Sequence, residues 1–241
     1  MGVELSYDAG GVTASSYYAG PEAGNARGAV LVFPEAPGVG AHVRRRVDLL
    51  AALGYAALGV DLYGQGRVAK GPEEARGWVG ALKADPAVLV ARMEAGLAAL
   101  LAQSGVSGRR VALAGYCFGG WCALELARSG AQVGSVTVFH GSVASVRGLG
   151  GLAGTSVLVC TGDADPFVPA EQLADFATEL REAQVDYQLC VYGGVGHGFT
   201  DRDAPTMPGF AYDAAADRRS WRSFLHLLDD QMDDAQSRTT R

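Results

Sequence analysis

The residues best suited to chemistry surround Cys117, which follows an apolar run and precedes a segment with helical spacing. Glycines stand two positions before it and two after it, at Gly115 and Gly119. This spacing is typical of a nucleophile on a sharp strand-to-helix turn, because glycine leaves room for the neighbouring chain. The start of a helix also favours negative charge, which helps a thiolate form. The pattern predicts a cysteine nucleophile, and the alternative interpretation is a buried cysteine in a glycine-rich turn.

The other three cysteines have apolar helix or strand contexts, and we expect them to be small core residues. They are Cys122, Cys160 and Cys190.

Two aspartates could orient a base for this nucleophile. Asp163 and Asp165 lie in the segment 162–169, directly after an apolar run at 157–161 that we interpret as a strand. Ligands of open parallel sheets bind beyond the carboxyl ends of the strands, so both carboxylates are well placed. Asp163 could instead bond the backbone of its own turn. Position alone does not decide between them.

A histidine in a glycine-rich loop is the candidate base. His197 lies in the segment 193–199, after an expected strand at 187–191. His140, which also follows an expected strand, is its rival. An α/β-hydrolase orders its triad as nucleophile, acid and histidine, and this order favours His197. The other two histidines are expected to cap a helix, contact solvent or pack on the surface: His42 and His226.

The elements that must position these residues alternate between short apolar runs and longer amphipathic segments. This alternation predicts an α/β fold with a mostly parallel central sheet and helices on both faces. The expected strands are 29–33, 55–60, 111–115, 133–139, 157–161 and 187–191, with an extra edge strand at 12–18. The expected helices are 42–53, 86–103, 119–129, 170–183 and 212–228. The polar, glycine-rich region 64–85 is expected to be a loop or a short-helix excursion near the strand ends.

The composition bounds the class of protein. With 241 residues, 49% of them apolar and 19% charged, the chain is expected to form one globular domain over 1–241, with a frayed polar tail at 229–241. A net charge of −6 does not indicate a basic surface that would bind nucleic acid or an anionic membrane. We see no secretory signal, no apolar run long enough to span a bilayer and no disulfide framework, so we expect a cytoplasmic protein.

Several separated motifs resemble those of the dienelactone hydrolase (carboxymethylenebutenolidase) family, which has the α/β-hydrolase fold. The resemblance covers about residues 29–228. It places Asp165, rather than Asp163, at the acid position of the family. The matching motifs are at 32–36, 61–64, 115–120, 162–169 and 196–199.

The resemblance also implies roles that the residues alone do not. Glu35 matches the family's glutamate that contacts the resting cysteine and moves when substrate binds, although by itself it looks like an ordinary loop carboxylate. The implied oxyanion hole consists of the backbone N–H groups of Phe118 and Ala36, since charge develops on the carbonyl oxygen during attack.

One position departs from the family pattern. The family's namesake binds the substrate carboxylate with arginines, one of them four residues after the histidine. Here Asp201 stands at that position and Arg202 follows it, while the other arginine could correspond to Arg67 or Arg76. An acidic residue would repel an anionic lactone. The resemblance therefore supports the hydrolase chemistry more strongly than it supports a dienelactone as the substrate.

Together these features predict a hydrolase that cleaves an ester or lactone bond of a small molecule through a thioester acyl-enzyme, with Asp165 orienting His197. This chemistry needs no metal and no organic cofactor. One alternative is a general short-chain carboxylesterase or thioesterase, and another is a non-catalytic binder or redox sensor. The oligomeric state is not indicated. Three aromatic residues could line an apolar pocket or belong to the core: Tyr63, Trp78 and Phe199.

Overall fold

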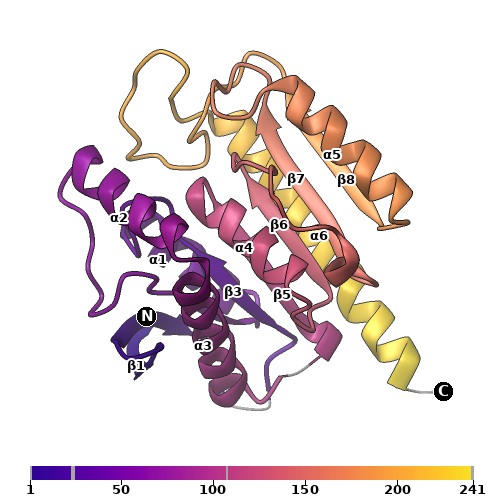
Figure 1. Ribbon diagram of the computed structural model, residues 1–241. Coiled ribbons are helices and arrows are strands. Elements are labelled where there is room, and N and C mark those ends of the chain that lie inside the picture. Colours follow the sequence, from indigo (N-terminus) through magenta and orange to yellow (C-terminus); the bar gives the residue numbers. More distant parts are fainter. Residues whose placement is uncertain (1, 23–24, 107, 240–241) are drawn as a thin grey trace. The chain divides into compact units, whose positions relative to one another are not determined.

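The computed structural model describes residues 2–22, 25–106 and 108–239 (Figure 1). The chain divides into two compact units, Met1–Ser107 and Gly108–Arg241, and each unit contains four paired strands with the helices that cover them. The expectation of a single domain over 1–241 stays a prediction.

Strands of the first unit follow the order β1-β2-β4-β3. β1 (Val3–Asp8) and β2 (Thr13–Ala19) form an antiparallel pair, and β2 also pairs antiparallel with β4 (Ala56–Gly59). β4 runs parallel to β3 (Ala29–Phe33), whose five residues are all buried. A strand that is buried on both faces has no polar face. The sequence of β3 is therefore a continuous apolar run, from which the strand was predicted.

The edge of this unit differs from the prediction. The strand expected at the edge, 12–18, corresponds to β2, which lies between β1 and β4. β1 has mostly exposed or half-buried side chains and therefore shows no apolar run. Its backbone pairing with β2 holds it in place, from Val3 opposite Tyr18 to Asp8 opposite Thr13.

Two helices of the first unit cover opposite faces of its strands. A Cβ atom at Gly59 would lie 2.9 Å from a valine of α1 (Ala41–Ala52). The next residue, Val60, lies 2.4 Å from the Cβ position of Gly96, in α3 (Pro86–Ser104). Successive residues of an extended chain point to opposite faces, so α1 and α3 lie on different sides.

The region 64–85 is more regular than expected, because it contains the helix α2 (Pro72–Ala84). Pro72 occupies the first helical turn, and Glu73 and Glu74 follow it. A proline and acidic residues in the first turn are helix-start signals, since proline needs no N–H there and carboxylates favour the helix N-terminus.

α3 is long and apolar enough, by length and composition alone, to cross a membrane, although Arg92 and Glu94 interrupt its apolar residues. The Asp85 side chain accepts a hydrogen bond from the Val88 N–H at its start. One face of α3 is buried by packing on β3 and β4 through Leu89, Met93 and Leu100. This is the packing of a surface helix that buries one face.

All strands of the second unit are parallel and follow the order β5-β6-β7-β8. Their carboxyl ends therefore lie at one edge, where loops can bring distant residues together. The strands are β5 (Val111–Tyr116), β6 (Ser135–Phe139), β7 (Ser156–Gly162) and β8 (Tyr187–Tyr192).

Helices of the second unit also cover both faces. A Cβ atom at Gly120, in α4 (Phe118–Arg128), would lie 2.8 Å from Val138. The next strand residue, Phe139, packs edge-on against a phenylalanine ring of α6 (Ala214–Thr239) at 5.7 Å. Figure 1 shows α4 in front of these strands and α6 behind them. The remaining helical segments are α5 (Ala170–Glu182) and the short 3₁₀ turns η1 (Gly108–Arg110) and η2 (Gly150–Leu152).

The closing helix is longer than expected. It was predicted to end at 228, but α6 continues to Thr239 through residues assigned to a polar tail; residues 240–241 lie outside the described part. Met232 is buried one turn after Leu228, and the Gln231 amide donates a hydrogen bond to the Val111 carbonyl at 3.0 Å. These contacts stabilise the helix just beyond residue 228, and neither produces a long apolar pattern in the sequence.

Candidate active site

Cys117 occupies the turn between β5 and α4. Its φ of 55° and ψ of −119° are unusual for a residue with a side chain, and such strain is characteristic of functional sites. The Cys117 N–H donates to the Phe139 carbonyl at 3.0 Å, and its carbonyl accepts from the Gly120 N–H at 3.0 Å. A Cβ atom at Gly115 would lie only 2.0 Å from the carbonyl oxygen of Gly119. The residue as a whole is half-buried.

Asp165 and His197 form a buried pair. The His197 Nδ1 atom lies 2.8 Å from Oδ2 of Asp165, and the Phe167 N–H donates to Oδ1 of the same carboxylate at 2.8 Å. The Asp165 side chain has no exposed surface, and that of His197 is 4% exposed. A carboxylate at Nδ1 fixes the tautomer and the orientation of the ring and leaves Nε2 on the other edge.

The backbone of His197 is held on both sides by the segment 209–211. Its N–H donates to the Gly209 carbonyl at 2.7 Å, and its carbonyl accepts from the Ala211 N–H at 3.1 Å. The imidazole also has aromatic neighbours, with Phe167 at 4.8 Å and Phe210 at 5.1 Å between ring centroids. The ring therefore has a single orientation in mostly apolar surroundings.

Cys117 is the other polar contact of His197. Burial works to lower the pKa of His197, but the hydrogen bonds with Asp165 and Cys117, together with the charges of both groups, raise that pKa to about 9. The protonated imidazole is thus favoured at neutral pH. A cysteine beside such a histidine can supply a nucleophile and an acid.

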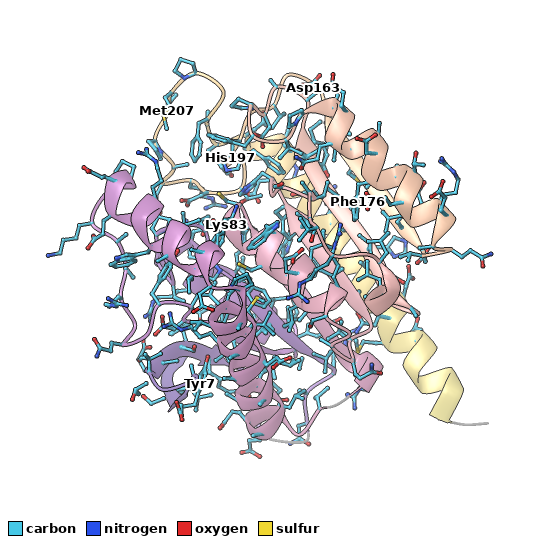
Figure 2. All side chains as sticks on the ribbon, viewed as in Figure 1. Tyr7, Lys83, Asp163, Phe176, His197 and Met207 are labelled. Carbon is cyan, nitrogen blue, oxygen red and sulfur yellow. The ribbon has the colours of Figure 1, made fainter. Side chains whose placement is uncertain are left out.

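The two rival residues have other contacts. His140 is fully buried, and its Nε2 atom lies 2.7 Å from the Thr200 hydroxyl. Its ring packs edge-on against that of His197 at 5.1 Å. Asp163 accepts a hydrogen bond from the backbone N–H of Gly194, in the loop that precedes His197. Asp163 thus bonds the backbone of another loop rather than only its own turn. Figure 2 shows Asp163 and His197 beyond the same ends of the parallel strands.

Glu35 lies in the first unit, just after β3, where it forms an ion-pair contact with His42 of α1. The Arg46 Nε atom donates to Nε2 of His42 at 3.1 Å. Burial works to raise the pKa of Glu35, but the charge and hydrogen bond of His42, with smaller contributions from the backbone and Arg46, lower it overall. Sequence reasoning expected His42 to cap a helix or contact solvent, and nothing in the local pattern indicates its partner.

The other predicted residues of the first unit gather around Tyr63. The Tyr63 hydroxyl donates to the Ala36 carbonyl at 2.7 Å, and its ring lies 4.9 Å from that of Trp78. The Arg67 guanidinium lies over the Trp78 ring at 5.0 Å and donates to the carbonyls of residues 63 and 64. Arg76 is exposed on α2.

The remaining predicted residues of the second unit are dispersed. Phe118 is the first residue of α4 and stacks on Trp121 at 5.9 Å. Phe199 is fully buried between the rings of His140 and Tyr192, a position that favours its core interpretation over a pocket wall. Arg202 is exposed.

Comparisons with known proteins identify the family to which this chain belongs. The model of the dienelactone hydrolase family matches residues 15–232. A curated protein of Bradyrhizobium sp, named "Probable 2-oxo-3-(5-oxofuran-2-ylidene)propanoate lactonase", is 28% identical over 232 residues, which are 88% of this chain and 88% of that protein.

Two solved structures are similar in both sequence and fold. The structure of m3DLH is 38% identical with a TM-score of 0.87, and the match covers 95% of this chain and 98% of that one. A dienelactone hydrolase-like promiscuous phosphotriesterase from metagenomic libraries is 35% identical with a TM-score of 0.88, covering 96% and 98%. These similarities confirm the predicted fold class, an α/β-hydrolase fold with mostly parallel strands and helices on both faces.

Proposed function

Because this chain belongs to the dienelactone hydrolase family, we propose that it hydrolyses ester or lactone bonds of small molecules through Cys117, His197 and Asp165. The observation that supports this proposal best is the sequence of contacts from Asp165 to His197, at 2.8 Å, and from His197 to Cys117. Nucleophile, base and orienting acid are recognised by such geometry rather than by their positions in the chain.

The first half of the reaction forms an acyl-enzyme. The thiolate of Cys117 attacks the carbonyl carbon, a C–S bond forms, and the carbonyl electron pair moves onto oxygen. The N–H of Phe118, at the start of α4, is one proposed donor to this oxyanion, because helix N-termini favour negative charge. The family resemblance assigns the second donor to the Ala36 N–H and assigns the release of the resting thiol to Glu35.

His197 then completes the first half and drives the second. Its imidazolium donates a proton to the leaving oxygen as the C–O bond breaks, which leaves a thioester on Cys117. The neutral imidazole next takes a proton from water, whose oxygen attacks the thioester carbonyl and releases the acid and the thiol. Asp165 keeps Nε2 directed toward the reacting atoms in both halves.

Asp201 favours neutral substrates over anionic ones. It occupies the position at which the family's namesake has a carboxylate-binding arginine, and a carboxylate there repels an anionic lactone. We therefore place uncharged esters and lactones first. Uncharged phosphotriesters are a second candidate, since a relative with 35% identity is a promiscuous phosphotriesterase.

A substrate panel on the wild type and two variants tests the proposal. We expect turnover of an aryl acetate and an uncharged lactone, and weaker turnover of a dienelactone carboxylate. Cys117→Ala should lose all of these activities while it still folds and unfolds cooperatively. Cys122→Ala is the matched control, because Cys122 is a buried cysteine of the helix that follows Cys117. Full turnover by Cys117→Ala would exclude this mechanism.

The same panel separates the narrower alternatives. Turnover of aryl esters with no lactone hydrolysis would indicate a general carboxylesterase, and preference for thioesters would indicate a thioesterase. Binding of these compounds without turnover of any would leave the non-catalytic binder as the correct interpretation.

A further inference from the structure

A second pair of thiols lies outside the candidate active site, on two neighbouring strands. Cys160 of β7 and Cys190 of β8 are register partners in the parallel ladder. Cys190 was expected to be a core residue, but it is partly exposed, whereas Cys160 is fully buried. The two side chains are in hydrogen-bonding contact, so they point to the same face.

Polar groups surround this thiol pair. The Gln188 amide donates to Sγ of Cys190 at 3.4 Å, and the Tyr192 hydroxyl donates to Sγ of Cys160 at 3.7 Å. Ser223 of α6 also lowers the pKa of Cys190. Residues 188, 190 and 192 alternate along β8 and therefore share one face with the thiol of β7. A cysteine that acts only as a small apolar core residue does not need hydrogen-bond donors around its sulfur.

These hydrogen bonds make the two thiols unequal. The hydrogen bond with Cys160 is the largest cause that lowers the pKa of Cys190; burial opposes it, and Ser223, Tyr192 and Gln188 lower the pKa further, to about 6. The same hydrogen bond, together with burial, raises the pKa of Cys160. At neutral pH one thiol of the pair is therefore a partly exposed thiolate, and the other is a buried, protonated thiol.

We propose that Cys160 and Cys190 form a second reactive site, at which a peroxide oxidises Cys190 and Cys160 then forms a cross-strand disulfide with it. Neighbouring strands are about 4.8 Å apart, and disulfides join Cα atoms that are about 4.4–6.8 Å apart. Register partners therefore need little backbone movement to bond. The site uses neither Cys117 nor His197 and is independent of the proposed hydrolysis.

The reaction balances with hydrogen peroxide as the oxidant. The Cys190 thiolate attacks one peroxide oxygen, an S–O bond forms, the O–O bond breaks, and hydroxide leaves and takes up a proton. The Cys160 thiol then loses its proton and attacks the sulfenic sulfur, so that an S–S bond forms and the S–O bond breaks with loss of water. Two thiols are oxidised by two electrons, and one peroxide is reduced to two waters.

Peptide mapping of the wild-type protein tests this proposal directly. After treatment with equimolar hydrogen peroxide, blocking of free thiols and unreduced tryptic digestion, we expect peptides 148–181 and 182–202 as one linked species, lighter by two hydrogens than their sum. The remaining cysteines, Cys117 and Cys122, lie together in peptide 111–128, so their oxidation is read separately. Reduction should release the two linked peptides.

Two variants assign the order of events. Cys160→Ser should stop at a sulfenic acid on Cys190 that dimedone traps, and Cys190→Ser should leave Cys160 unoxidised. Cys122→Ala is the control and should still form the link. The proposal is wrong if peroxide oxidises peptide 111–128 while 148–181 and 182–202 stay unlinked, or if Cys160 is oxidised in Cys190→Ser. Failure of ester hydrolysis would not affect this outcome.

Discussion

Asp163 accepts a hydrogen bond from the backbone N–H of Gly194, which joins the loop after β7 to the loop after β8. The first loop contains Asp165 and the second leads to His197, so this bond helps to set the distance between the proposed acid and base. The two neighbouring aspartates thus differ in function: one holds the loops and the other faces the imidazole.

Substitution of each aspartate distinguishes these roles. Asp165→Asn should lower kcat by roughly 10³–10⁴-fold, because the amide stabilises the wrong tautomer of His197. Asp163→Asn should lower kcat by roughly tenfold or less and should destabilise the fold by about 1–2 kcal/mol, since an amide oxygen is a weaker acceptor. Steady-state kinetics and urea unfolding measure both. Equal losses of kcat in the two variants would contradict the assignment of Asp165.

The titration of His197 depends on Cys117. We expect an imidazole pKa of about 9 in the wild type, and a lower one in Cys117→Ala, because this variant removes a hydrogen bond and a negative charge. NMR of the histidine ring follows both titrations. kcat/KM should fall as pH rises through about 9, where the imidazolium that protonates the leaving oxygen is lost. An unchanged His197 pKa in Cys117→Ala would show that the two side chains do not interact.

The same shift makes stability depend on pH. His197 binds its proton more tightly in the folded protein, so this contribution is fully present below about pH 6.5 and is lost as pH rises through about 9. A shift of this size corresponds to roughly 3 kcal/mol for a buried group. Urea unfolding across this range should show a steeper loss of stability for the wild type than for His197→Gln. Parallel curves for the two proteins would rule out this contribution.

Glu35 and His42 should be energetically coupled. His42→Ala leaves the carboxylate of Glu35, whose side chain is 19% exposed, without its main partner and should cost about 2–3 kcal/mol of unfolding free energy. The double variant Glu35→Gln/His42→Ala should lose less than the sum of the single variants, because no buried charge is left unpaired. If the losses of the two single variants add up to that of the double variant, the contact between Glu35 and His42 contributes nothing to stability.

The turn at Cys117 should require glycine at position 115. In Gly115→Ala the new methyl group would lie 2.0 Å from a backbone oxygen, so the turn must move or the protein must unfold. We expect a loss of about 2–3 kcal/mol of stability and of most activity. Gly148→Ala is the matched control, since nothing lies within 4 Å of its Cβ position. A stable, active Gly115→Ala protein would show that this turn tolerates a side chain.

Some structural features could be predicted from the sequence because they depend only on short stretches of chain. The spacing around Cys117 predicts a tight turn, since glycines flank the cysteine at positions 115 and 119 and a helix directly follows a strand. β3 and β5 are buried throughout, so their apolar runs were visible. β1 was not predicted, and for α2 a short helix was only one of two expected alternatives, because both elements have largely exposed side chains and show no long apolar pattern.

Only the tertiary structure decided which residues meet. Asp163 and Asp165 are two positions apart and were equivalent by position, but only Asp165 reaches the imidazole of His197. The pairing of Glu35 with His42 and the partial exposure of Cys190 were likewise invisible in the sequence. Side-chain direction and burial depend on how distant segments pack, and no local pattern of residue types encodes them.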